Sequence, residues 1–281
     1  MKPGHESQTA VMVCAARAAA HGRTNVAAFA DPTALALLPE DARQRVEQFR
    51  SGVPPKSLRE RIRYAFIEKR SKMMVARTVA IDGAIRDGAS SQVVILGAGL
   101  DGRAWRMPEL ADVTVFEVDH PDSQREKRER AVLLEQAARE VRFVPVDFTR
   151  DRLEDALASA GHDPARQTTW VWEGVVMYLE RADIKATLRV VEARSALGSS
   201  LVVVYHSPSI IRWIGGFFLR RLGEPFRSAF TADEMLTLLA GFGFTVVQDD
   251  DLPTIATRLS TEFADTTRLL KDMRIVTAER R

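Results

Sequence analysis

Two groups of residues in the middle of the chain have the types and spacing of a nucleotide-cofactor site. The segment Gly97-Ala-Gly-Leu-Asp-Gly102 follows a short apolar run that is typical of a buried strand. Glycine lets the backbone approach a ligand because it has no side chain and tolerates positive φ. The next predicted strand ends in Glu117-Val-Asp119, about 20 residues further on, where a carboxylate accepts hydrogen bonds from ribose hydroxyls. The pattern therefore predicts a cofactor that contains a ribose.

NAD and S-adenosylmethionine both contain that ribose, and three features favour S-adenosylmethionine. Asp101 lies within the glycine segment, where its carboxylate would repel a pyrophosphate. About 90 residues precede the first predicted strand, whereas dinucleotide-binding domains more often begin close to it. The fourth predicted strand runs into Glu173, so this carboxylate is expected near the ammonium group of a methionine. An NAD-dependent oxidoreductase is the alternative.

The elements that position these residues change character near residue 90. The preceding pattern is helical, with segments from Thr9, over 40–49 and over 57–86, where Ser57 and Glu60 form a capping box. Short strands then alternate with helices of crossover length. The predicted strands are 92–96, 113–118, 142–146, 169–172, 200–205, 244–247 and 274–278. The predicted helices are 121–139, 150–160, 181–197 and 231–242.

This order predicts an α/β fold with a doubly wound, mostly parallel seven-stranded sheet, Rossmann-like in the manner of class I methyltransferases. Residues 1–90 are expected to form an N-terminal helical cap that is part of the same domain. Residues 91–281 are expected to form the cofactor-binding α/β domain, with a lid at about 207–230 after the fifth strand.

Composition sets limits on partners and location. The 281 residues include 40 Lys and Arg against 38 Asp and Glu, so the net charge of +2 predicts neither a nucleic-acid nor a membrane partner. No apolar run approaches the roughly 20 residues of a membrane span. Cys14 is the only cysteine and the five histidines do not cluster, so we expect no disulfide and no metal site. These features predict a soluble, cytoplasmic protein; they do not predict its oligomeric state.

Several motifs, in order along the chain, resemble the leucine carboxyl methyltransferase family, and most closely its bacterial branch of small-molecule O-methyltransferases and polyketide-tailoring enzymes. The main matching stretches are 94–106, 116–121, 146–147 and 172–179. Shorter matches are 9–17, 31–32, 76–78 with 81–82, and 222–227. One departure stands at Gly102, where the family usually has Thr. The resemblance implies S-adenosylmethionine as cofactor and no metal.

The resemblance also implies roles for individual residues. The implied cofactor-binding residues are Arg77 (the carboxylate), Gly97 and Gly99 (the methionine part), Asp119 (the ribose), Asp147 with the backbone of Phe148 (the adenine), and Glu173 (the amino group). The residues by themselves leave other roles open. Arg77 is also consistent with a solvated helix residue, Asp119 and Asp147 with helix caps, and Glu117 competes with Asp119 for the ribose.

The methyl acceptor is less clearly specified. A carboxylate has a solution pKa near 4 and needs no base, whereas a phenol near 10 benefits from one. His206, just past the fifth strand, is the candidate base, and Tyr178 is a second candidate catalytic residue. The candidate substrate-binding residues are Tyr205, Arg212, Trp213 and Phe217. Apolar walls with cations suit an acidic or aromatic small molecule; the alternative is that the aromatic residues pack the lid and the arginines face solvent.

The sequence thus predicts an S-adenosylmethionine-dependent O-methyltransferase that acts on a carboxylate or hydroxyl of a small molecule. By resemblance, its place is natural-product biosynthesis and secondary metabolism. The alternatives are an NAD-dependent oxidoreductase, methylation of a protein C-terminal carboxylate, and a cofactor-binding relic that acts as an interaction module.

Overall fold

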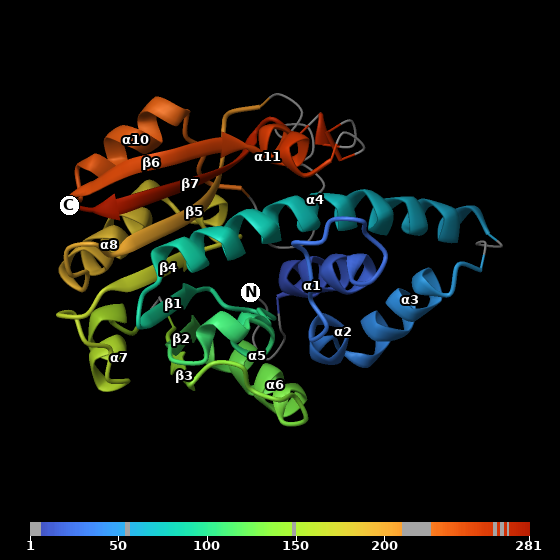
Figure 1. Ribbon diagram of the computed structural model, residues 1–281, viewed down its shortest axis with the longest axis horizontal. Helices are drawn as coiled ribbons and strands as arrows, with labels where there is room; N and C mark the ends of the chain where they lie inside the picture. Colours follow the sequence, from blue (N-terminus) through green and yellow to red (C-terminus); the bar gives the residue numbers. More distant parts are fainter. Residues whose placement is uncertain are drawn as a thin grey trace.

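A seven-stranded sheet of order β3-β2-β1-β4-β5-β7-β6 forms the centre of the computed structural model, and helices cover both of its faces (Figure 1). The described residues are 7–53, 57–147, 150–209, 226–260, 263–264, 267–268 and 270–281. The strands are β1 (Gln92–Leu96), β2 (Thr114–Asp119), β3 (Glu140–Pro145), β4 (Thr168–Trp172), β5 (Ser200–His206), β6 (Phe244–Asp251) and β7 (Met273–Arg280). Strands β1 to β5 pair in parallel, and β7 is antiparallel to β5 and β6. The predicted sheet is confirmed.

The helices of the first 90 residues are α1 (Gln8–Ala20), α2 (Ala34–Leu37), α3 (Glu40–Arg50) and α4 (Leu58–Gly88). The predicted capping box starts α4, with Ser57 and Glu60 each bonding the other's backbone N–H. Later helices are α5 (Arg103–Arg106), η1 (Pro108–Leu110), α6 (Pro121–Ala131), α7 (Leu153–Ser159), η2 (Val176–Tyr178), α8 (Arg181–Ala193), α10 (Ala232–Ala240) and α11 (Leu252–Leu259). No helix in the described ranges is both long and apolar enough to span a membrane.

Several boundaries differ from the prediction: the helices predicted over 150–160 and 181–197 span Leu153–Ser159 and Arg181–Ala193. Two larger differences concern α6 and β6. The helix predicted over 121–139 ends at Ala131. The N–H groups of Ala137 and Ala138 donate to the carbonyl of Ala104 at 3.0 and 2.8 Å, so these two residues are outside the helical hydrogen-bond pattern. Strand β6 continues past the predicted end at 247 to Asp251, where it still pairs with β7. The prediction stopped early because a register shift after Val246 interrupts the alternation of side chains. In addition, α11 was not predicted.

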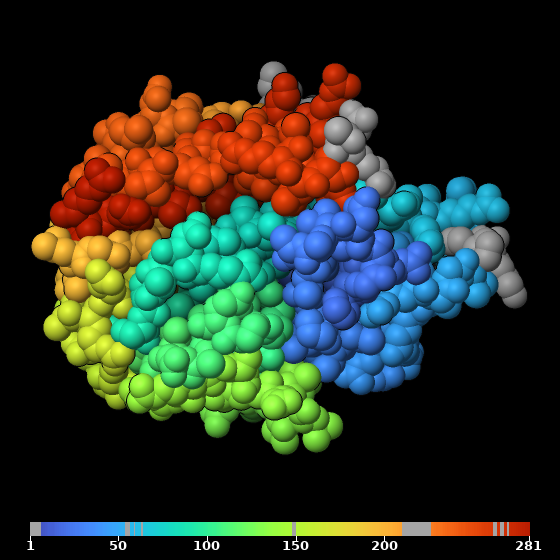
Figure 2. All heavy atoms as spheres, viewed as in Figure 1, coloured from blue at the N-terminus to red at the C-terminus, as the bar shows by residue number. Residues whose placement is uncertain are grey.

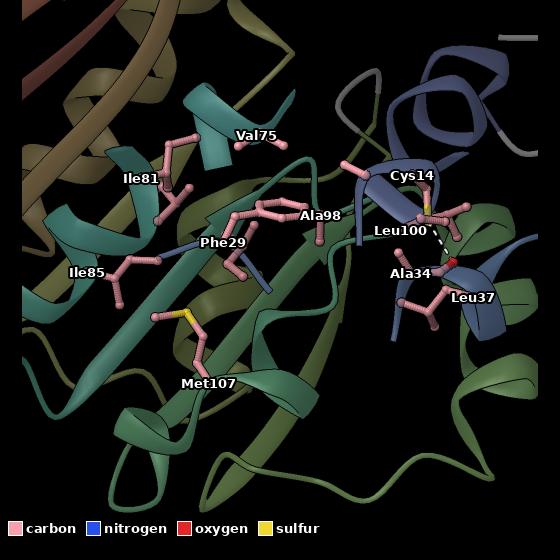
Figure 3. Packing of buried hydrophobic residues seen from close by; sticks show 14 of the residues in the cluster. Cys14, Phe29, Ala34, Leu37, Val75, Ile81, Ile85, Ala98, Leu100 and Met107 are labelled. Atoms are coloured by element: carbon pink, nitrogen blue, oxygen red, sulfur yellow. Dashed lines mark hydrogen bonds between the residues drawn. The ribbon is translucent and has the colours of Figure 1, made fainter. Parts of the chain in front are cut away.

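Each face of the sheet has its own hydrophobic core. Val93 and Ile95 of β1 point into the cluster formed with α1 to α4 and α11, part of which is seen in Figure 3. Val94 and Leu96 point into the cluster with α7, α8 and α10. Both faces are covered, as expected for parallel strands that read as continuous apolar runs. Figure 2 shows the N-terminal helices packed against α4 and the segment after β1. The first 90 residues therefore share a core with the sheet.

The carboxyl edge of the sheet is where this topology leaves an opening. β1 lies between β2 and β4, so the connections that leave β1 and β4 diverge to opposite sides. Ligands of doubly wound folds bind at such a switch point. The interior of β1 is buried, but Gly97, Asp119 and Glu173, which stand at or just past the ends of β1, β2 and β4, are each partly exposed. The fold thus presents these three predicted site residues at one edge.

Candidate functional site

The glycine segment makes a close turn over the end of β2. Gly97 and Gly99 have φ of +71° and +48°, a region that favours glycine. The N–H groups of Gly97 and Ala98 donate to the carbonyl of Val118 at 2.8 and 3.0 Å. A Cβ on Gly97 would stand 2.3 Å from a methyl of Val175. Both glycines are therefore required by the backbone path, independently of any ligand.

Gly102 is explained by its neighbour Thr33. A Cβ at position 102 would stand 2.2 Å from the hydroxyl oxygen of Thr33, which itself donates to Asp31 at 2.9 Å. A larger residue would displace this hydrogen-bonded hydroxyl. Thr33, in the segment before α2, thus occupies the space that a side chain at position 102 would need, which accounts for glycine at this position.

Asp119 is fixed at the end of β2 by two backbone donors. Its Oδ2 accepts from Gly99 N at 2.5 Å and its Oδ1 from His120 N at 2.6 Å. Burial raises the pKa of Asp119, and these two hydrogen bonds only partly oppose that shift. The N-cap of α6 is His120, whose side chain accepts from Asp122 N. Asp119 is therefore an oriented carboxylate at the sheet edge and not the helix cap.

Glu117, the rival for the ribose, is buried away from the edge. It has no exposed surface, and its Oε2 lies 2.6 Å from Lys127 Nζ. Lys127 Nζ lies 5.1 Å from the centre of the Trp105 ring. Burial raises the pKa of Glu117 to about 7, although Lys127 acts to lower it. Glu117 is therefore an interior residue. Of the two carboxylates at the end of β2, Asp119 is the one that a ligand can reach.

Arg77 and Glu173 face each other across the opening between α4 and β4. Arg77 Nη2 lies 2.6 Å from Glu173 Oε1, and both side chains are almost wholly buried. Burial by itself would raise the pKa of Glu173, but Arg77 and Arg103 hold it below its usual range. Burial and the neighbouring arginines Arg17 and Arg103 lower the pKa of Arg77, against the effect of Glu173. The Nε of Arg77 is buried and has no hydrogen-bond partner among the described residues.

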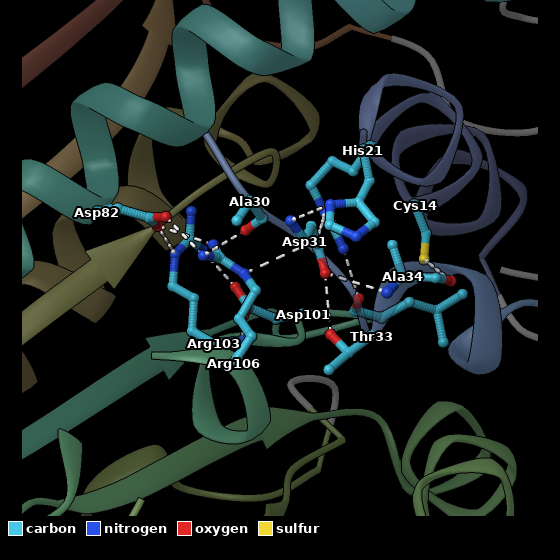
Figure 4. Close-up of polar contacts among 12 residues, drawn as sticks. Cys14, His21, Ala30, Asp31, Thr33, Ala34, Asp82, Asp101, Arg103 and Arg106 are labelled. Carbon is cyan, nitrogen blue, oxygen red and sulfur yellow. Dashed lines mark hydrogen bonds and ion pairs between the residues drawn. The ribbon is translucent and has the colours of Figure 1, made fainter. Parts of the chain in front are cut away.

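A buried network of charges, which was not predicted from the sequence, holds this pair in place. Arg103 Nη1 donates to Glu173 at 2.9 Å and also to Asp101, while its Nε donates to Asp82 at 2.7 Å. Arg106 binds Asp82 through two hydrogen bonds of 2.7 and 2.9 Å (Figure 4). The signal was present in the sequence as charges within otherwise apolar helical patterns, Asp82 among them.

The network continues into the N-terminal helices and accounts for Asp101. Arg17 of α1 donates to Asp31 at 2.8 Å and to the carbonyl of Leu100 at 2.6 Å. Asp101 is buried with its carboxylate accepting from Arg103, whose charge helps to hold its pKa low. Its charge is thus compensated inside the protein. The repulsion of a pyrophosphate that the sequence suggested for Asp101 is therefore weaker than expected.

An aromatic cluster lies at the edge of the sheet beyond β4 and β5. The rings of Tyr178 and Phe226 stack with centroids 5.6 Å apart, and the His206 ring lies 5.9 Å from that of Phe226. His206 is 7% exposed, and its Nδ1 is 3.5 Å from Asp272 Oδ2. Segment 226–230 is tied to the edge because Arg227 N donates to the carbonyl of Met177 at 2.8 Å. The two candidate catalytic residues thus share one neighbour, Phe226.

Tyr205 and Asp147 are two further predicted residues. The Tyr205 side chain is fully buried, with its hydroxyl donating to Asp249 at 2.7 Å and accepting from Arg274 at 3.0 Å. These bonds account for it as a structural residue of the sheet, not a substrate contact. Asp147 lies at a turn after β3, where Arg150 Nε is 3.3 Å from its carboxylate. Phe148, Arg212, Trp213 and Phe217 lie outside the described residues.

Comparisons with known proteins agree with this architecture. The family model for leucine carboxyl methyltransferase matches residues 10–192. A Frankia alni protein classed as an S-adenosyl-L-methionine-dependent methyltransferase is 34% identical over 224 residues, covering 77% of this chain and 74% of its own. A Mycobacterium sp. (strain JLS) protein of the same class is 34% identical over 220 residues, covering 78% and 72%. A crystal structure of a DUF574 family protein from Streptomyces avermitilis shares the fold, with TM-score 0.61, 13% identity and 98% of each chain covered.

The sheet order, the glycine turn and the acid at the end of β2 define a class I methyltransferase fold. The chain belongs to the leucine carboxyl methyltransferase family and is an S-adenosylmethionine-dependent methyltransferase. The NAD-dependent alternative is set aside on this basis.

We predict that Tyr205→Phe destabilises the protein without weakening binding of S-adenosylmethionine. The hydroxyl joins β5 to Asp249 and Arg274, so its loss should lower the free energy of unfolding by about 1 kcal/mol. Urea denaturation and calorimetry measure the two effects separately. A variant of unchanged stability that binds the cofactor more weakly would contradict the structural role.

A second prediction concerns the Glu117–Lys127 pair. The folded-state pKa of Glu117, about 7, lies above its ordinary value of 4.5, so the folded protein keeps a proton that the unfolded chain releases. Stability due to this group is therefore present at low pH and lost as pH rises from about 4.5 to 7. Relative to Glu117→Gln/Lys127→Met, the wild type should lose on the order of 3 kcal/mol over that window. Urea denaturation of both proteins at pH 5, 6, 7 and 8 tests this, and parallel pH profiles would contradict it.

Proposed function

We propose that this methyltransferase transfers a methyl group to a carboxylate or hydroxyl oxygen of a small molecule, in natural-product biosynthesis. The observation that carries the proposal is the arrangement at the carboxyl edge of the sheet. The Arg77–Glu173 pair and the oriented Asp119 stand on α4, β4 and β2. The cluster of Tyr178, Phe226 and His206 gathers at the same edge, beyond β4 and β5. We further propose residues 1–90 as a helical cap of the same domain.

The residues at the edge fit S-adenosylmethionine. Arg77 is buried with an Nε that has no partner among the described residues, and Arg17 and Arg103 are close enough to lower its pKa. A carboxylate bound at Arg77 would satisfy this donor and offset the surplus positive potential. The Asp119 carboxylate accepts hydrogen bonds from two backbone N–H groups and has further lone pairs that can accept from hydroxyl groups. The fit therefore rests on donors and acceptors that the protein itself leaves incompletely used.

In this proposal the cofactor residues divide their tasks. Arg77 binds the cofactor carboxylate, and Glu173, kept ionised by Arg77 and Arg103, accepts from its ammonium group. Gly97 and Gly99 bring backbone close to the methionine part. Asp119 accepts from the ribose hydroxyls, and Asp147 with the backbone of Phe148 contacts the adenine. Bound S-adenosylmethionine supplies the electrophilic methyl group.

The acceptor residues have to align a nucleophilic oxygen and exclude water. A carboxylate is ionised at neutral pH and needs no base, whereas a hydroxyl has to lose its proton. His206 is our candidate for that task, and Asp272 Oδ2, 3.5 Å from its Nδ1, would orient the ring. Tyr178 and Phe226 offer a flat apolar wall beside it. An acidic or aromatic acceptor fits these surroundings, and the C-terminal carboxylate of a protein has the same reacting group.

Asp119→Ala should weaken binding of S-adenosylmethionine at least tenfold, because two hydrogen bonds to a charged acceptor are lost. Isothermal titration calorimetry measures the affinity, and circular dichroism checks the fold. Glu109→Gln is the matched control, since Glu109 forms an exposed ion pair with Arg86. Wild-type affinity in Asp119→Ala would remove Asp119 from the site.

The pH dependence of turnover separates the two kinds of acceptor. Acceptors found by transfer of labelled methyl groups are assayed from pH 6 to 9 with wild type and His206→Asn. A carboxylate acceptor should give a flat rate that the substitution leaves within about threefold, and a hydroxyl acceptor should give a rate that rises with pH and depends on His206. A hydroxyl acceptor methylated equally well by His206→Asn would exclude His206 as the base.

A further inference from the structure

The first half of α4 carries a stripe of exposed apolar side chains. Leu58, Ile62 and Phe66 are 75%, 63% and 50% exposed. They are spaced four residues apart, so they lie on one face of the helix. Figure 1 shows this end of α4 extending beyond the sheet beside α3. Large apolar side chains gathered on one exposed face indicate a binding surface.

The same face of α4 leads to the cofactor site. Arg70 follows Phe66 by four residues, and Arg77 follows Arg70 by seven, which is two helical turns or about 10 Å. Arg77 is the residue that faces Glu173. A molecule lying on Ile62 and Phe66 therefore has one end directed along α4 towards the site.

Arg70 is a partly buried cation at the junction between the stripe and the site. Its guanidinium lies 4.3 Å from the centre of the Phe66 ring, and its Nη1 is 3.7 Å from Met12 Sδ. Among the described residues no carboxylate pairs with it. Burial lowers the pKa of Arg70, and the charged or titratable groups that act on it are Tyr178, which raises it, and Arg77, which lowers it.

Other buried arginines among the described residues have oxygen acceptors. Arg17, Arg77, Arg103 and Arg106 face carboxylates, and Arg194 donates to the carbonyl of His162 at 2.5 Å. A cation taken partly out of water is costly unless an anion or good hydrogen-bond acceptors face it. Among the described residues Arg70 has a thioether and an aromatic ring instead, so its surroundings are complementary to an anion.

A small apolar cavity adjoins Arg70. Its volume is about 110 Å³, and it lies between α1, α3 and α4. Its walls include Val11, Met12, Ala15, Val46 and Phe66, with Arg45 and Arg70 supplying charge. Arg45 is already paired with Asp41 at 2.7 Å. A cavity of this kind accepts a hydrocarbon group and leaves Arg70 as the cation available to its polar end.

We propose that this face of α4 binds the methyl acceptor, and that the acceptor is a lipophilic anion. Arg70 pairs with an acidic group of the acceptor, while Ile62, Phe66 and the adjoining cavity hold its apolar body. The inference rests on the proposed function, because the face continues to Arg77. It narrows the acceptor class to molecules that combine an acid with an extended apolar skeleton.

The test uses two fluorescent probes with the same apolar body, the anionic 8-anilinonaphthalene-1-sulfonate and the neutral N-phenyl-1-naphthylamine. Wild type should bind both, and decanoate should displace the anionic probe more effectively than decanol does. Arg70→Gln should bind the anionic probe at least tenfold more weakly and the neutral probe within twofold of wild type. Arg70→Lys should restore most of the anionic affinity, and Phe66→Ala should weaken both probes.

Two controls separate this inference from the proposed function. Arg189→Gln, on the exposed face of α8, should leave both probe affinities unchanged. Calorimetry with S-adenosylmethionine should give wild-type affinity in Arg70→Gln. Failure of wild type to bind the cofactor would count against the proposed function whatever the probes show. Absence of anionic-probe binding in wild type, or an equal effect of Arg70→Gln on both probes, would overturn the inference.

Discussion

The buried pairing of Arg103 with three carboxylates is the interaction on which the rest of the site depends. Asp101 belongs to the loop after β1, Asp82 to α4 and Glu173 to the end of β4. One guanidinium therefore joins the glycine turn, the long helix and the switch point of the sheet. Burying these charges is costly, and only nearly complete pairing offsets the loss of hydration. The geometry of this carboxyl edge of the sheet follows from that requirement.

The pairing of buried charged side chains with one another also explains which groups remain available to ligands. Glu117 is paired with Lys127 in the interior, whereas two backbone N–H groups hold Asp119 at the edge of the sheet. Arg77 shares Glu173 with Arg103 and keeps a buried donor unused. Arg70, further along the same helix face, has no carboxylate among the described residues. Two arginines of α4, Arg70 and Arg77, are therefore available to anionic groups, and Asp119 is available to hydrogen-bond donors at the edge of the sheet.

The sheet was predicted well because the pattern that identifies a strand lies within a few neighbouring residues. Apolar runs of strand length identified β1 to β5 within two residues at each end, and the glycine turn and Asp119 follow directly from them. The charge network was missed because its partners, such as Arg17 with Leu100, lie far apart in the chain and have no common periodicity. Tyr205 was assigned to a pocket because position at a strand end does not reveal that Asp249 and Arg274 bind its hydroxyl. Long-range pairing is information that local patterns do not contain.

A crystal structure with S-adenosylhomocysteine would show whether the charge network presents Arg77 and Asp119 to the cofactor. We expect Arg77 to lie within about 3 Å of the ligand carboxylate and Asp119 within about 3 Å of the ribose hydroxyls. We also expect Arg103 to keep its bonds to Asp101 and Glu173. A ligand bound away from Arg77 and Asp119, or binding that breaks the Arg103–Glu173 contact, would contradict these expectations.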